Sequence, residues 1–123
     1  MGQYSRQALE NLSRATGFDR DYARRVLANV VSEEENVKSV VGKVRLGEAD
    51  AGIVYRSDVT PALSRFLRQV EIPDSANVLA SYAIAVVEGS RLPHAAREFV
   101  ALVLSPTGQR ALQRQGLLPA TVP

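Results

Sequence analysis

Three consecutive glutamates, Glu33 to Glu35, stand directly before a segment that has the hydrophobic spacing of a helix. Valines recur there at positions 37, 40, 41 and 44, which places them on one helix face. The start of a helix carries unpaired backbone N–H groups and about half a positive charge, so it stabilises acidic side chains and also binds anions from solution. The predicted chemistry is anion binding, by the chain's own side chains or by an external ligand.

Side chains near this helix start can cap it without any ligand. Ser32 and Glu35 have the spacing of a capping box, and Asn36 is an alternative N-cap. Clustered carboxylates can also bind a metal ion, but no histidine and no second carboxylate cluster converges on Glu33 to Glu35 from sequence spacing. The sequence therefore predicts capping and no protein ligands for a metal ion.

A tyrosine lies at the end of a short apolar segment. The residues AGIV at 51–54 precede Tyr55, and residues 56–58 lead into the next predicted helix. Ligands of open α/β sheets bind at the carboxyl ends of strands, which makes Tyr55 a candidate binding residue. A packed tyrosine whose hydroxyl reaches water explains the same position. The strand end alone leaves both interpretations open.

Residue types that carry catalysis are scarce. His94 is the only histidine and has no nearby arrangement of serine and aspartate, so we expect a surface or capping residue. Gly42, Gly47 and Gly52 are separated by helix and strand patterns and do not form a phosphate-binding loop. The absence of cysteine excludes disulfides, thiolate metal sites and cysteine nucleophiles. We expect a protein that is not an enzyme and uses no cofactor.

The elements that position these residues alternate between helix and strand. Pro61 falls in the first turn of one predicted helix and Gly47 at the end of another, which are positions that these residues favour. The alternation predicts an α/β fold with parallel strands in its sheet. The patterns predict helices at residues 4–15, 18–25, 37–45, 58–68, 94–104 and 106–116, and strands at 26–31, 51–55, 69–72 and 81–88.

The composition fits one ordinary globular domain. The chain has 123 residues, of which 46% are hydrophobic, and no apolar run approaches the roughly 20 residues that cross a bilayer. Its first residues, MGQYSRQALE, lack the apolar core of a signal peptide, so we expect no export signal in this chain. The net charge of +2 comes from arginines scattered among acids and not from a basic block. Nucleic-acid binding is therefore not expected.

Three segments match a known pattern in order and spacing: ENVKSVVGKVRLGEADAGIVYRSDV, YAIAVVEGS and AREFVALVLSPTGQRALQRQGLLP. Together they resemble the carboxyl-terminal half of the periplasmic molybdate-binding proteins of ABC transporters, a family of type II periplasmic binding proteins. The opening GQYSRQALENL resembles a helix of the same family. Ala83 and Leu117 depart from the family pattern, in which proline and phenylalanine are usual at those positions.

The resemblance implies a truncated form of a two-lobed protein. The expected fold is α/β, a periplasmic binding protein type II-like lobe with a mixed sheet flanked by helices. Residues 1–80 would form most of the second ligand-binding lobe. Residues 81–123 would supply a crossing strand and carboxyl-terminal helices of the first lobe, whose amino-terminal part is missing. Apolar faces that lose their partners in this way favour association, so we expect a homodimer.

The resemblance also implies two binding residues. The backbone N–H of Val37 and the hydroxyl of Tyr55 match donors that bind the oxyanion in that family. A third donor, a backbone amide, falls on Met1, and the family's two serine ligands have no counterpart in this chain. Neutral N–H and O–H donors can hold a doubly charged oxyanion without a buried lysine or arginine.

The function that the resemblance implies is the capture of molybdate or tungstate in the periplasm or another extracytoplasmic space. The partners would be the membrane subunits of an ABC permease, with no catalysis and no cofactor. Sulfate or another small anion is an alternative ligand, because hydrogen-bond count and cavity size are what separate these anions. A cytosolic ligand-sensing regulatory domain of the same architecture is the alternative from another functional class.

Overall fold

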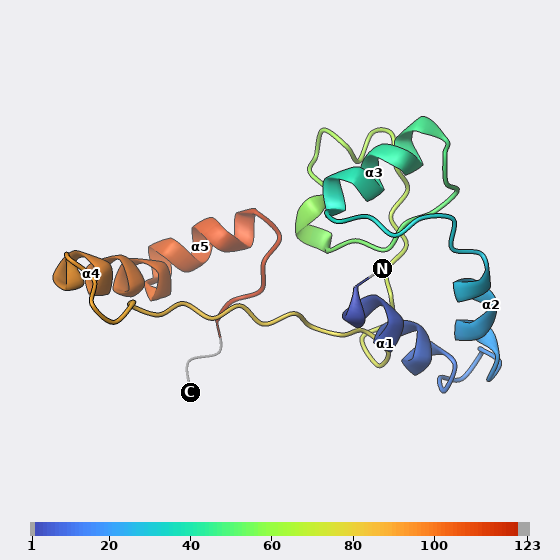
Figure 1. Ribbon diagram of the computed structural model, residues 1–123, viewed down its shortest axis with the longest axis horizontal. Helices are drawn as coiled ribbons and strands as arrows, with labels where there is room; N and C mark the ends of the chain where they lie inside the picture. The colour runs from blue at the N-terminus through green and yellow to red at the C-terminus, as the bar shows by residue number, and fades with distance from the viewer. Residues whose placement is uncertain (1, 121–123) are drawn as a thin grey trace. The chain divides into compact units, whose positions relative to one another are not determined.

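The computed structural model describes residues 2–120, and the chain divides between Ala80 and Ser81 into two compact units. Each unit is a separate cluster of short helices and connecting segments (Figure 1). None of the helices in the described part of the chain is long and apolar enough to span a membrane.

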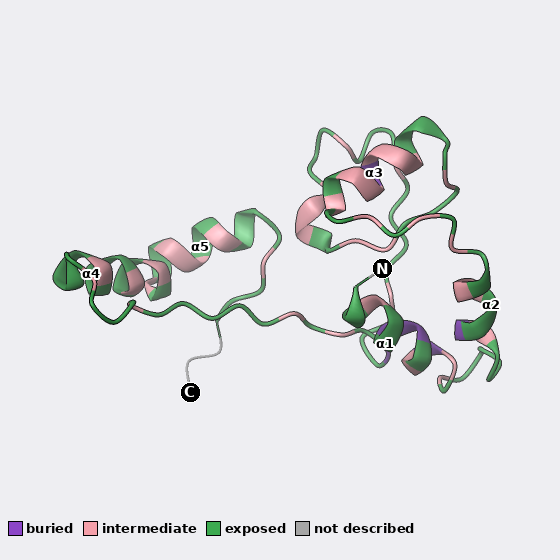
Figure 2. Cartoon of the chain, viewed as in Figure 1, coloured by how far each residue is buried: buried purple, intermediate pink, exposed green. Residues whose placement is uncertain are grey.

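Two helices form the core of the first unit: α1 (Gln3–Leu12) and α2 (Tyr22–Ala28). The apolar face of α1 buries Leu9 and Leu12 against Ala23 of α2 and against Ala76. Figure 2 shows buried residues on both helices. The Asn11 side chain donates a hydrogen bond to the Ala76 carbonyl at 3.2 Å, which ties the later segment to α1. Partly buried residues complete this core: Tyr22, Val26, Leu27, Ile53 and Ile72.

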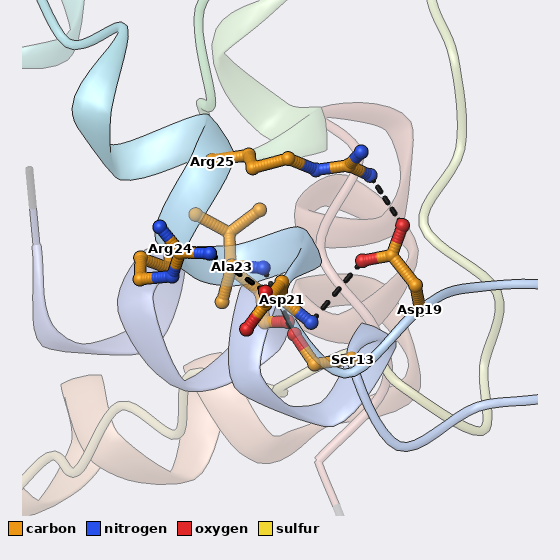
Figure 3. Close-up of polar contacts among 7 residues, drawn as sticks. Ser13, Asp19, Asp21, Ala23, Arg24 and Arg25 are labelled. Carbon is orange, nitrogen blue, oxygen red and sulfur yellow. Dashed lines mark hydrogen bonds and ion pairs between the residues drawn. The ribbon is translucent and has the colours of Figure 1, made fainter.

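Polar contacts fix the loop between α1 and α2 (Figure 3). The Ser13 hydroxyl accepts a hydrogen bond from the Ala23 backbone N–H at 2.9 Å and so joins the two helices. The Asp19 carboxylate accepts from the Asp21 backbone N–H at 3.1 Å and pairs with Arg25 at 2.6 Å. These contacts hold residues 18–21 in a turn. The helix predicted from residue 18 therefore begins only at Tyr22, and the one predicted for 4–15 ends at Leu12.

The third helix, α3 (Val37–Leu46), has the bounds that its valine pattern predicts to within one residue. Gly47 ends it in the left-handed conformation, with φ of 75°, and the Glu48 backbone N–H donates to the Lys43 carbonyl at 2.9 Å. A residue with a side chain is strained in this conformation, which explains why glycine stands there. The prediction that Gly47 closes the helix is confirmed.

The predicted strands are not formed by residues 2–120. The strand expected at 26–31 is wrong at its start, because Val26 and Leu27 pack against the core as part of α2. The segments 51–55, 69–72 and 81–88 exchange no ladder of backbone hydrogen bonds with one another. A strand is stable only when a neighbouring strand satisfies its N–H and C=O groups. The mixed sheet therefore stays a prediction.

The helix predicted at 58–68 is also wrong. In its place the structure has a short 3-10 helix, η1 (Arg56–Asp58), followed by turns at residues 61–66. The Thr60 carbonyl accepts from the Leu63 N–H at 2.9 Å and from the Ser64 N–H at 3.1 Å, but these turn bonds do not continue into an α-helix. Pro61 disfavours a helical conformation at Thr60, so a regular α-helix that runs through this point is disfavoured.

The second unit contains two helices, α4 (Pro93–Leu104) and α5 (Pro106–Arg114), close to their predicted bounds. Each begins with proline, whose missing N–H costs nothing in the first turn. Ser105 joins them: its hydroxyl donates to the Leu102 carbonyl at 2.6 Å and accepts from the Gly108 N–H at 3.2 Å. No residue of either helix is buried (Figure 2).

Candidate functional site

The backbone N–H of Val37 is the first amide of α3. The Asn36 side chain caps this helix, accepting from the Ser39 backbone N–H at 3.0 Å and from the Ser39 hydroxyl at 3.2 Å. The cap thus provides an acceptor for the third amide of the helix, that of Ser39, but none for the first, that of Val37. Within residues 2–120, the Val37 N–H makes no hydrogen bond. It is a donor available to an external acceptor, in the field of a helix start.

Two of the three preceding glutamates form ion pairs. A Glu33 carboxylate oxygen lies 2.6 Å from Arg6 Nη2, and Glu34 Oε1 lies 3.1 Å from Lys43 Nζ. The Ser32 hydroxyl also donates a hydrogen bond to Glu34. These contacts, first that of Ser32 and then that of Lys43, hold the pKa of Glu34 below its ordinary value. The capping box of Ser32 and Glu35 is not formed, because Ser32 bonds Glu34 and Asn36 is the N-cap.

Tyr55 directly precedes η1, and its carbonyl accepts the Asp58 backbone N–H at 3.0 Å. The residue is 41% exposed, and its hydroxyl makes no hydrogen bond to another described residue. The backbone turn therefore fixes the position of this residue while the hydroxyl stays free to donate. Both interpretations of the sequence, a ligand residue and a tyrosine that reaches water, agree with this exposure.

A close contact links the segment before Tyr55 to α3. A Cβ on Gly52 would lie 2.6 Å from Val40 Cγ1, so only glycine lets the segment approach this helix face so closely. Gly52 stands three residues before Tyr55, and Val40 stands three residues after Val37. The structure thus places the two predicted binding residues on neighbouring segments of the first unit. That their donors face one cleft stays a prediction, and the third predicted donor, Met1, lies outside the described residues.

The structure adds features that sequence reasoning missed. Asp58 Oδ2 is buried without a hydrogen-bond partner among the described residues, one turn after Tyr55. Buried polar atoms in native proteins are rarely unpaired. No sequence signal distinguishes this carboxylate from an exposed one. An open hollow of about 370 Å³ lies on α5 in the second unit, lined by Arg110, Gln113 and Arg114, and it contains neither predicted binding residue.

Other candidate chemistry is absent from the described part of the chain. His94 is exposed on α4, with Nδ1 3.4 Å from Glu98 Oε1, which confirms that it is a surface residue. No group of three histidine, aspartate or glutamate side chains within residues 2–120 is arranged to hold a metal ion. The candidates that remain are two neutral donors, the Val37 N–H and the Tyr55 hydroxyl.

Comparison with known proteins gives a consistent family. The sequence profile of the bacterial extracellular solute-binding proteins matches residues 1–118. Over 88 residues the chain is 43% identical to the molybdate-binding protein ModA of Mycobacterium bovis and to the protein of that name in two strains of Mycobacterium tuberculosis. The alignment covers 72% of this chain and 33% of each relative, so the match spans about a third of the length of these curated relatives. No solved structure matches significantly.

Proposed function

The chain belongs to the family of bacterial extracellular solute-binding proteins, and from this premise we propose that it contributes to the capture of molybdate for an ABC permease. The observation that carries the proposal is the 43% identity to proteins named for molybdate binding. Family membership also implies binding without catalysis and a location outside the cytoplasm. Tungstate is a second ligand of the same chemistry, because it is also a doubly charged tetrahedral oxyanion.

The binding residues that we propose are Val37 and Tyr55. The Val37 N–H has no acceptor within residues 2–120, and Tyr55 is 41% exposed with its hydroxyl unpaired there. Both donors are neutral, so they can stabilise a dianion without a buried cation, which costs free energy to desolvate. In the same proposal, residues 1–80 form most of the second lobe and residues 81–123 contribute to the first, with a mixed sheet completed by the rest of a two-lobed protein.

The test is calorimetric titration of molybdate into a two-lobed protein that contains this sequence. Tyr55→Phe should weaken binding by about 1 to 3 kcal/mol, the usual effect of losing a hydrogen bond to a charged group. Tyr82→Phe is the matched control, since Tyr82 is 73% exposed and is not a proposed donor. Equal affinities of Tyr55→Phe and the unsubstituted protein would show that this hydroxyl does not bind the anion.

The 123-residue chain should bind molybdate far more weakly than the two-lobed protein. Donors of the first lobe are not among its residues, and each is worth about 1.5 to 3 kcal/mol, so the loss amounts to several powers of ten in affinity. Sub-micromolar binding by this chain alone would contradict the division of the site between two lobes. Titration with sulfate in place of molybdate measures how far the donors discriminate by anion size.

A further inference from the structure

Lys43 contacts one of the glutamates that precede α3. Its Nζ lies 3.1 Å from Glu34 Oε1 and 3.8 Å from Glu48 Oε2. The Ser32 hydroxyl donates to the same oxygen of Glu34. The Glu34 side chain is only 21% exposed, whereas the side chains in the pair of Arg6 and Glu33 are each 49% exposed. Solvent therefore screens the pair of Lys43 and Glu34 less than that exposed pair.

Without this ion pair, Glu34 has a competing position close by. Glu34 stands three residues before Val37, and the start of a helix attracts carboxylates. Lys43 stands six residues after Val37, so its Cα lies about 9 Å further along the helix axis. The ion pair therefore draws the Glu34 carboxylate away from the first turn of α3.

We infer that Lys43 is a positioning residue that keeps the Val37 N–H open to an oxyanion by holding Glu34 away from it. The inference rests on the proposed role of Val37 in molybdate binding. Direct attraction of the anion by the Lys43 ammonium is the competing explanation. Direct attraction makes the effects of Lys43 and Glu34 additive. Positioning makes them coupled, because the charge of Glu34 then matters only when Lys43 no longer holds it.

The first measurement needs no ligand. In the ¹⁵N-labelled chain, Lys43→Gln should move the Val37 amide proton downfield, because a carboxylate becomes its acceptor. The double variant Lys43→Gln/Glu34→Gln should return the resonance to its original position. Arg20→Gln is the control for charge, since Arg20 is exposed and forms no ion pair among the described residues. An unmoved Val37 resonance in Lys43→Gln overturns the inference, whatever the chain binds.

The second measurement adds sodium molybdate, up to millimolar concentration, to the same samples and follows the Val37 amide. Lys43→Gln should raise the apparent Kd about threefold, and Glu34→Gln should restore it in the Lys43→Gln background while changing little alone. Additive effects of the two substitutions overturn the inference in favour of direct attraction. If the ligand-free shifts follow the predicted pattern but molybdate moves no resonance of the unsubstituted chain, the positioning of Glu34 stands and the proposed function fails.

Discussion

The two compact units differ in how far their helices are buried. In the first unit, α1 and α2 bury Leu9, Leu12 and Ala23 around Ala76. In the second, α4 and α5 begin with proline and are joined by the capping contacts of Ser105, yet neither helix has a buried residue. Proline marks the starts of α4 and α5, whereas α1 and α2 begin without proline or a side-chain cap and are stabilised by burial.

Truncating the core of the first unit should have the largest effect. Leu9 is 4% exposed, so Leu9→Ala removes buried methyl groups and should lower the free energy of unfolding by about 2 to 5 kcal/mol. In the second unit Leu118 is 65% exposed, and Leu118→Ala should change it by less than about 0.5 kcal/mol. Urea denaturation followed by circular dichroism measures both. Equal effects would contradict a core confined to the first unit.

Association should depend on the second unit. The exposed apolar side chains of α4, among them Phe99 at 59% exposure, favour a homodimer, and Phe99→Ala should weaken it by about 1 to 2 kcal/mol. Phe66 of the first unit is 67% exposed and serves as the matched control. Light scattering over a micromolar concentration range measures the mass. A monomer at every concentration would exclude the dimer, and an equal effect of Phe66→Ala would place the contact elsewhere.

Loss of a helix cap should act differently in the two units. Asn36→Ala and Ser105→Ala each remove a side-chain acceptor at a helix start, a change worth about 1 kcal/mol. In the first unit the loss should lower the midpoint of urea unfolding. In the second, helices without buried residues are marginal, so the loss should appear as lower helicity at 222 nm in the absence of urea. A shifted midpoint for both variants would show that the units unfold together.

Acid should weaken the first unit slightly. A hydrogen bond and the charge of Arg24 lower the pKa of Asp21, and contacts of Ser32 and Lys43 lower that of Glu34. A carboxyl whose folded pKa is depressed stabilises the fold above its unfolded pKa, and this contribution is lost as the pH falls through the folded value, here below about pH 4. Carboxyl NMR titration should show both pKa values below the ordinary range. Arg24→Gln should return only that of Asp21, and an unchanged Asp21 titration in this variant would contradict the pairing.

Local sequence patterns predicted the bounds of α3 and α5 closely. The spacing of the valines predicted α3, and Pro106 predicted the start of α5. The strands could not be predicted in the same way, because a strand depends on partners distant in sequence. The first three residues of VLANVV instead form the end of α2, where Val26 and Leu27 pack against the core. The effect of Pro61 on Thr60 was a local signal that the prediction of a helix at 58–68 overlooked.

The candidate site was likewise predicted in part from the sequence, and its remaining contacts depend on residues distant in the chain. Hydrophobic periodicity placed Val37 at a helix start, and the family resemblance selected it and Tyr55 as donors. Lys43 lies 3.1 Å from Glu34, nine residues before it, and 3.8 Å from Glu48, and spacing alone did not predict that Glu34 is the nearer partner. The burial of Asp58 Oδ2 likewise depends on the surrounding chain.

The sequence by itself determined the family, the starts of α1, α3, α4 and α5, the lack of cysteine chemistry and the identity of the candidate donors. These properties depend on residue types and on contacts within about one turn, which the order of residues specifies directly. Only the tertiary structure decided that Asn36 and not Ser32 caps α3, that Gly52 lies against Val40, and that Glu34 pairs with Lys43. Those outcomes are choices between competing partners, and the relative free energies of such partners depend on the distances and burial that the folded chain creates.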